Sequence, residues 1–257
     1  MKIATWNING INRRLDLLSD WLLGAMPDVL CLQELKCAST GFPAEALEQA
    51  GYGAVWSAEG RWNGVAIIAR DAVPVLTQLN LPGDDDDKQA RYIEAAVAGK
   101  IIGSIYAPNG NPWPGPKFDY KLAWLDRLAR HAGNLVAEGV PLILSGDINV
   151  APEPIDIYET RSYDDNALVQ PEARERYQSI LKAGLSDVFR HFDATGSGYT
   201  FWDYRRRRWE RNAGLRLDHI LVNNKVLSSV RSIYADSAVR GLENASDHAP
   251  VWIEIET

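Results

Sequence analysis

The chain has 257 residues, of which 46% are hydrophobic and 9% aromatic, enough for a sizeable core. Its net charge of −7 argues against a protein that coats nucleic acid with its whole surface, so a polyanion must be met locally or through a metal cation. Two cysteines, Cys31 and Cys37, are too few for a disulfide framework or a four-thiolate zinc site, and we expect both to be reduced.

No linker rich in proline, glycine or serine divides the chain, so we expect one domain over residues 1–257. No apolar run is long enough to span a membrane, which takes about 18 residues. The opening MKIATWN reads as a strand and lacks the charged and apolar regions of a secretory signal. We therefore expect a soluble, cytoplasmic protein with no membrane partner.

The N-terminal part of the chain alternates strand, helix and strand. Short apolar runs predict strands over 3–6 and 29–32, and apolar residues at helical spacing predict a helix over 15–26. This order is typical of a sheet covered by helices. Four more runs, with a tight turn at Gly99-Lys100, predict a mixed sheet with antiparallel members: 64–69, 75–81, 92–98 and 101–106.

Polar side chains follow three of these predicted strands. Asn7 and Asn9 come at the end of the first, Glu34 after the second, and Tyr106 at the end of the last. Glu34 is either a surface acid or a functional carboxylate. Tyr106 is either a core ring with its hydroxyl at the rim, or a donor to a phosphate oxygen.

The stretch LILSGDINVAP, residues 142–152, carries the strongest local signal. We predict a buried strand over Leu142 to Ser145, with Gly146 allowing the chain to leave the sheet, so that Asp147 and Asn149 point to one face. An acid beside an amide can take a proton from water and hold the oxygen that water attacks. The alternative is an ordinary polar turn. Helices are predicted over 117–138 and 171–183, and neither shows chemistry of its own.

Residues 195–217, TGSGYTFWDYRRRRWERNAGLRL, interleave aromatic residues with arginines. Arginine contacts phosphate bidentately, and aromatic rings stack on bases or sugars. This is the one local basic patch on an acidic chain, so it favours a nucleic-acid contact. The alternative is that the aromatic residues are core and the arginines form a solvated rim.

Asp218 lies inside an apolar run, where an unpaired carboxylate is costly, so it needs a partner. His248, just before the last predicted strand, can supply one. A histidine oriented by a buried aspartate can polarise a water or stabilise a phosphorane charge. The adjacent Asp247 faces elsewhere and could bind a hard cation.

Taken together, these clusters resemble the endonuclease/exonuclease/phosphatase superfamily and, within it, the bacterial exonuclease III branch of apurinic/apyrimidinic endonucleases. The resemblance covers nearly the whole chain and is carried by five motifs in order: Trp6-Asn7-Ile8-Asn9-Gly10, Leu32-Gln33-Glu34, Gly146-Asp147-Ile148-Asn149, Arg216-Leu217-Asp218 and Ser246-Asp247-His248-Ala249-Pro250.

The resemblance implies a four-layer α/β sandwich, with two packed mixed sheets between helices and strand-end loops that converge on one cleft. It implies hydrolysis of the phosphodiester 5′ to an abasic site in duplex DNA, with 3′ to 5′ exonuclease and 3′-end phosphodiesterase or phosphatase activity. The implied cofactor is Mg²⁺, for which Mn²⁺ can substitute. The partner would be double-stranded DNA with abasic sites or 3′ ends, and the protein would be a monomer.

The resemblance also assigns roles to residues of this chain. Glu34 would be the main metal ligand, supported by Asn7 and Asp247. Asp147 would transfer the proton, Asn149 and Tyr106 would hold the phosphate, and His248 would pair with Asp218; which of Asp147 and the histidine pair activates water stays open. Phe201, Trp202 and Leu217 match the pocket for the base-free sugar. The remaining contacts with DNA would come from Lys36, Arg91, Asn109 and Arg205.

Two departures and two rivals complete the prediction. Asn9 and Leu215 follow the bacterial pattern. Leu35 and Trp62 depart from the family pattern, and the sequence does not explain their effect. A phosphomonoesterase or sphingomyelinase of the same superfamily would keep the polar core, but residues 200–216 favour DNA. A catalytically silent DNA-binding relative would have no chemical need for Glu34, Asp147 and His248 together.

Overall fold

The computed structural model describes residues 1–160 and 163–256, which form two six-stranded mixed sheets packed face to face. The first sheet has the order β11-β12-β1-β2-β4-β3, with strands Val230–Ala235, Val251–Ile255, Lys2–Asn7, Val29–Gln33, Val65–Arg70 and Tyr52–Ser57. The second has the order β5-β6-β7-β8-β10-β9, with strands Val75–Leu79, Tyr92–Val97, Lys100–Tyr106, Leu142–Asp147, Asp218–Asn223 and Leu185–Asp187.

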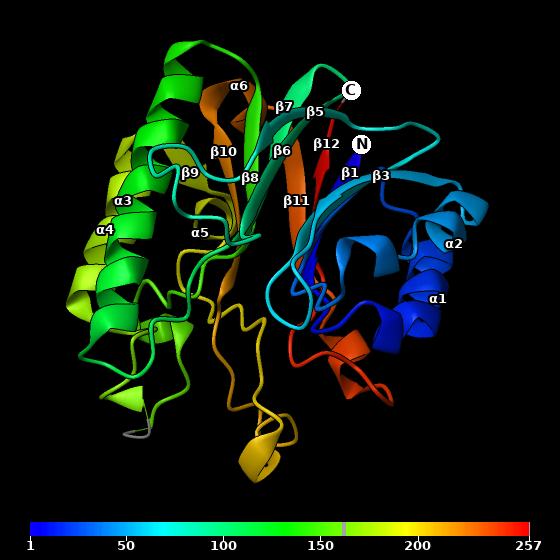
Figure 1. The fold of residues 1–257 in the computed structure, drawn as a ribbon. Coiled ribbons are helices and arrows are strands. Elements are labelled where there is room, and N and C mark those ends of the chain that lie inside the picture. Colours follow the sequence, from blue (N-terminus) through cyan, green and yellow to red (C-terminus); the bar gives the residue numbers. More distant parts are fainter. Residues whose placement is uncertain (161–162, 257) are drawn as a thin grey trace.

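Helices cover the outer face of each sheet, as Figure 1 shows. On one side lie α3 (Pro116–Ala137) and α4 (Pro171–Lys182); on the other lie α1 (Leu15–Ala25) and α2 (Ala44–Gln49). Two short helices, α5 (Val188–Phe192) and α6 (Asn224–Leu227), flank β10. The predicted four-layer α/β sandwich is confirmed. Among the described residues, no helix has both the length and the apolar character needed to cross a membrane.

Three apolar clusters hold the layers together, and strand periodicity divides residues among them. In β8, Leu142 and Leu144 pack under α3 and α4, whereas Ile143 packs between the sheets. In β1, Ile3 faces the inter-sheet core and Ala4 faces α1. Both faces of the central strands are therefore buried, which explains why these strands read as continuous apolar runs in the sequence.

Strand register brings the polar clusters to one edge of the sandwich. In the parallel pair β1–β2, Asn7 lies opposite Gln33, the residue before Glu34. In the parallel pair β7–β8, Tyr106 lies opposite Asp147, and Asp147 in turn lies opposite Asp218 of β10. Because parallel strands end at the same edge, residues distant in sequence meet there.

Candidate active site

The site is built on two copies of one local arrangement. Asn9 donates its backbone N–H to the side-chain oxygen of Asn7 (3.1 Å), and Asn149 donates in the same way to Asp147 (2.9 Å). Asn9 and Asn149 both have left-handed backbones, with φ of 49° and 53°. Each pair therefore forms a turn at the end of its strand, in which a side-chain oxygen of the last strand residue accepts a backbone N–H two residues later.

The prediction that Gly146 lets the chain leave the sheet is wrong. Strand β8 continues through Gly146 to Asp147. A Cβ at Gly146, where φ is 149°, would lie 2.0 Å from the carbonyl oxygen of Ile105 on the neighbouring strand β7. The glycine is required because it lets two strands approach closely, and this keeps Asp147 beside Tyr106.

Asp147 is 1% exposed and sits at the centre of the site. One of its oxygens accepts hydrogen bonds from the side-chain amides of Asn7 (2.9 Å) and Asn149 (3.2 Å) and lies 3.8 Å from Nε2 of His248. Burial, and to a lesser degree the charges of Asp218 and Glu34, raise the pKa of Asp147 to about 7. A carboxyl group that titrates near neutral pH is suited to proton transfer.

His248 is paired with Asp218, as the sequence predicted, with Nδ1 2.8 Å from a carboxylate oxygen. The hydroxyl of Thr200 donates to that same oxygen (2.6 Å) and accepts from the backbone N–H of Asp218 (3.1 Å). Burial alone would lower the pKa of His248, but the charges of Asp218 and Asp147 outweigh it and raise the pKa to about 10. His248 is therefore an imidazolium at neutral pH.

Glu34 contacts two polar neighbours in the site, Asn7 and Lys36. It accepts a hydrogen bond from the Asn7 amide (2.9 Å) and pairs with the Lys36 ammonium (2.6 Å), which also donates to Asn9. Burial opposes ionisation, but Lys36 and Asn7 overcome it and hold the pKa of Glu34 below its ordinary value. Glu34 is thus a carboxylate at neutral pH, and Lys36 neutralises part of its charge.

Three groups lie close enough to hold one metal ion. Ligand atoms of Glu34, Asp147 and His248 are all within 4.8 Å of one another. Two carboxylates are hard oxygen donors, so this set fits a divalent cation such as Mg²⁺. Of the predicted ligands, Asn7 presents its amide nitrogen to the two carboxylates, and Asp247 accepts a hydrogen bond from Asn9 (2.9 Å) outside this group.

Tyr106 and Arg91 stack at the edge of the cluster, with the guanidinium 4.9 Å from the ring centre. Burial, reinforced by the charges of Glu34 and Asp147, raises the pKa of Tyr106 well above its ordinary value. The phenol therefore stays protonated and can donate a hydrogen bond. Asn109 is exposed and donates to the side-chain oxygen of Asn149 (3.1 Å), so it lies beside the predicted phosphate contact.

Residues 195–217 extend beyond the sandwich beside the strand ends, as the gold loop in Figure 1 shows. Phe201 packs against His248 with tilted rings whose centres are 4.9 Å apart, and it is partly exposed. Leu217, which packs with Phe201, and Trp202, which packs on Trp209, are each 2% exposed, whereas Arg205 is exposed. The buried aromatic residues and the solvent-facing arginines from 205 to 207 agree with the alternative of a core with a solvated rim, and the nucleic-acid contact stays a prediction.

Lys121 is a functional candidate that the sequence did not reveal. It lies fully buried on α3, and its ammonium donates to the backbone carbonyls of Asn109 (3.2 Å), Asn149 and Ala167 (3.4 Å). Burial lowers its pKa to about 7. Lys121 therefore joins the loops that follow β7 and β8. Helical spacing gave no signal for it, because its partners are backbone groups from distant segments.

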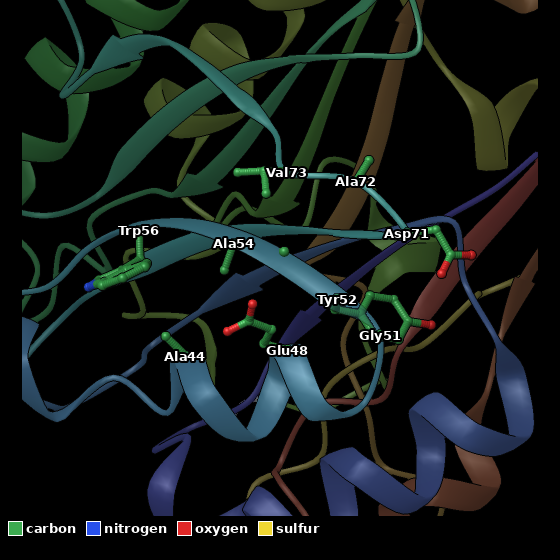
Figure 2. Close-up of a pocket in the computed structure, with 10 residues that line it drawn as sticks. Ala44, Glu48, Gly51, Tyr52, Ala54, Trp56, Asp71, Ala72 and Val73 are labelled. Atoms are coloured by element: carbon green, nitrogen blue, oxygen red, sulfur yellow. The ribbon is translucent and has the colours of Figure 1, made fainter.

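A pocket of about 650 Å³ lies between α2 and β3, lined by Glu48, Trp56 and Val73 among others (Figure 2). None of its lining residues belongs to the polar cluster around Asp147. The volume of a cavity therefore does not locate the chemistry in this chain. The convergence of titratable groups does.

Comparison with known proteins agrees with this geometry. Residues 4–248 match the model of the Endonuclease/Exonuclease/phosphatase family. The chain is 30% identical to exodeoxyribonuclease III of Haemophilus influenzae over all of both chains, and 31% identical to the DNA repair nuclease APEX1 of Danio rerio, over 98% of this chain and 81% of that protein.

Two solved structures superpose over the full length of both chains. The 3′ phosphatase NExo from Neisseria, bound to a product DNA hairpin, gives a TM-score of 0.96 at 37% identity. An AP endonuclease from Archaeoglobus fulgidus gives 0.95 at 35% identity. On these matches, the chain belongs to the endonuclease/exonuclease/phosphatase family.

Proposed function

We propose that this protein is a DNA repair nuclease that hydrolyses the phosphodiester 5′ to an abasic site in duplex DNA. The observation that carries the proposal is the meeting of Glu34, Asp147 and the His248–Asp218 pair at one edge of the sandwich, in a member of this family. The relatives named as AP endonuclease, DNA repair nuclease and exodeoxyribonuclease III support DNA as the substrate.

The buried residues divide the work of hydrolysis. Asp147, with a pKa of about 7, takes a proton from the attacking water. Asn149, whose side-chain amide is bonded to Asp147 (3.2 Å), would hold the phosphate beside it. His248, charged and fixed by Asp218 (2.8 Å), stabilises the negative charge that develops on phosphorus-bound oxygens. The high pKa of His248 makes it a poor base at neutral pH, which favours Asp147 for that role.

A divalent cation, Mg²⁺ or Mn²⁺, would be held by the carboxylates of Glu34 and Asp147, with the charged His248 beside them rather than as a ligand. When bound, such an ion neutralises charge on the phosphate oxygens. Lys36, whose ammonium pairs with Glu34 at the rim of the site, would also contact the DNA backbone. Arg91, Asn109 and Arg205 would supply further phosphate contacts at the rim.

Phe201 would form the exposed wall of a pocket for the base-free sugar, with Trp202 and Leu217 backing it from the core. A ring beside His248 excludes water from one side of the reacting phosphate. We propose that the protein acts as a cytoplasmic monomer, in line with the resemblance that motivated these assignments.

A second candidate is removal of phosphate or nucleotides from 3′ ends. It is favoured by the similarity to a Neisseria protein named as a 3′ phosphatase and, in a second structure at 38% identity, as a 3′-5′ exonuclease. The same catalytic groups serve both reactions, because in each one water attacks phosphorus, the P–O3′ bond breaks and a 3′ hydroxyl is left.

One experiment tests both candidates. Three duplexes, carrying an internal abasic-site analogue, a 3′-phosphate or a recessed 3′-hydroxyl end, are incubated with the protein and Mg²⁺ or a chelator, and products are resolved by length. We expect a single Mg²⁺-dependent cut 5′ to the abasic site. Cleavage of the 3′-modified duplexes alone would make the second candidate the main activity, and no cleavage of any duplex would reject the proposal.

A further inference from the structure

A second polar pocket, of about 380 Å³, adjoins the active site and is lined by three arginines, Arg13, Arg14 and Arg240. Tyr204 and Asn9 complete its polar wall. Asn9 also contacts Asn7, Lys36 and Asp247, so one residue joins this pocket to the catalytic cluster.

Arg14 is 4% exposed, yet its guanidinium bonds only to neutral groups. It donates to the backbone carbonyls of Asn9 and Ala245 and to the hydroxyl of Tyr204 (2.9 Å). Its Nε is buried and has no hydrogen-bond partner. The positive charge of Arg14 is therefore stabilised by neutral carbonyl and hydroxyl groups and not by a carboxylate.

Arg240, which also lines the pocket, is likewise bonded only to a neutral group. It is 8% exposed and donates twice to the backbone carbonyl of Trp202, at 3.2 and 3.0 Å. Its guanidinium lies 4.8 Å from the ring centre of Tyr204. Arg13 is exposed at the same pocket and adds a third positive charge.

Within residues 1–160 and 163–256, none of these three arginines forms an ion pair with a carboxylate. Asp247, next to the site, is held by Asn9 instead (2.9 Å). A buried cation without a counterion is costly, because it has lost its water without gaining an opposite charge. An anion in the pocket would remove that cost.

We propose that this pocket binds a phosphate group. Arginine presents a planar fork of donors that matches phosphate oxygens, and two of the three arginines are fixed in advance by packing. The phosphate comes either from the backbone of bound DNA, an assignment that rests on the proposed function, or from free inorganic phosphate, which does not depend on it.

Calorimetric titration with inorganic phosphate, in chelator and at an ionic strength matched with NaCl, tests binding without DNA. We expect Arg240→Gln and Arg13→Gln each to weaken binding about tenfold, as the loss of a charge-assisted hydrogen bond predicts. Arg130→Gln, an exposed arginine on α3, should bind like the parent. Because Arg13 is exposed, its variant keeps the test valid if Arg240→Gln does not fold. No phosphate binding by the parent, or equal binding by all variants, overturns the proposal.

Duplexes with one neutral methylphosphonate linkage, moved stepwise along the strand, identify the source. If the affinity difference between the parent and Arg240→Gln disappears at one linkage, the pocket binds that DNA phosphate. If it persists at every linkage while phosphate titration still separates the variants, the ligand is free phosphate. A protein that binds inorganic phosphate here but cleaves no duplex would leave the pocket established and reject only the nuclease proposal.

Discussion

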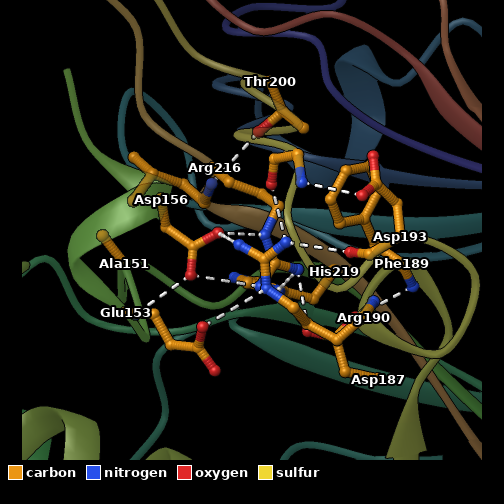
Figure 3. A network of polar contacts seen from close by, with 12 residues as sticks. Ala151, Glu153, Asp156, Asp187, Phe189, Arg190, Asp193, Thr200, Arg216 and His219 are labelled. Atoms are coloured by element: carbon orange, nitrogen blue, oxygen red, sulfur yellow. Dashed lines mark hydrogen bonds and ion pairs between the residues drawn. The ribbon is translucent and has the colours of Figure 1, made fainter.

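Two of the buried polar clusters among the described residues differ in how their charges balance. The first, shown in Figure 3, joins Arg190 and Arg216 to Asp156 and Asp187. The two arginines match the two acids. Against the effect of burial, contact with His219 and the charge of Arg216 hold the pKa of Asp187 far below its ordinary value, and the charge of Asp187 holds the pKa of Arg216 above its own. Such a network stabilises the fold and leaves no charge for a ligand.

The active site has the opposite character. Glu34, Asp147 and Asp218 lie together, with Lys36 and His248 as the cations paired with them, and the pKa of Asp147 is raised to about 7. Uncompensated charge is retained where a cation, a proton or a substrate is to be bound. The comparison teaches that burial alone does not separate structural from functional polar groups, whereas charge balance does.

The largest expected effect is on catalysis. Asp147→Asn removes the proton acceptor without removing phosphate contacts, so we expect the single-turnover rate of abasic-site cleavage to fall by about 10³ or more while DNA binding stays within a few-fold of the parent. Gel-shift binding on the same duplex is the control. A rate above a tenth of the parent value would count against this role.

The second largest expected effect is on folding stability, through the charge-balanced cluster of Arg190, Arg216, Asp156 and Asp187. Arg216→Met leaves Asp156 and Asp187 buried without their main cation, so we expect the free energy of unfolding in urea to fall by about 3–5 kcal/mol. Asp147→Asn, an equally buried change in the unbalanced cluster, should not destabilise in this way. Equal losses in the two variants would remove the distinction between the clusters.

The two clusters should also respond to pH with opposite signs. The folded-state pKa of Asp147, about 7, is above its ordinary 3.8, so its ionisation destabilises the fold as pH rises between these values. Asp147→Asn should therefore gain stability relative to the parent by about 3 kcal/mol between pH 4.5 and 7.5, at about 1.36 kcal/mol per pH unit.

Asp187 gives the control with the opposite sign. Its folded-state pKa is lowered, so it contributes stability above its ordinary pKa that is lost as pH falls. The free energy of unfolding of Asp187→Asn should fall below that of the parent by the largest amount at neutral pH and by the smallest amount near pH 3. Thermal unfolding across this range checks both variants, and parallel pH curves would contradict the assignment.

The smallest expected effect concerns Thr200, whose hydroxyl fixes the Asp218 oxygen that holds His248. Thr200→Val should lower the turnover number about tenfold and shift the alkaline limb of the pH–rate profile, with little change in DNA affinity. Thr200→Ser should restore both, because it keeps the hydroxyl. A loss that serine does not rescue would show that Thr200 acts only through packing.

The sequence predicted the residues that end apolar runs. Glu34, Asp147 and Asp218 could be predicted because a carboxylate beside a buried strand is costly unless it has a partner or a function. The four layers followed from the family resemblance. Lys121 and Thr200 could not be predicted, because their partners lie on segments brought near only by folding. Gly146 was misinterpreted for the same reason, since the Ile105 carbonyl that forbids a side chain belongs to the neighbouring strand.

The central claim is that the unbalanced carboxylates bind the cation that DNA hydrolysis needs. The most direct measurement is the Mg²⁺ dependence of abasic-duplex cleavage by the parent and by Glu34→Gln, with chelator as the zero point. We expect no cleavage in chelator and a midpoint for Mg²⁺ that rises at least about tenfold in the variant, because one carboxylate ligand is lost. Cleavage that persists in chelator, or an unchanged midpoint, would contradict the account.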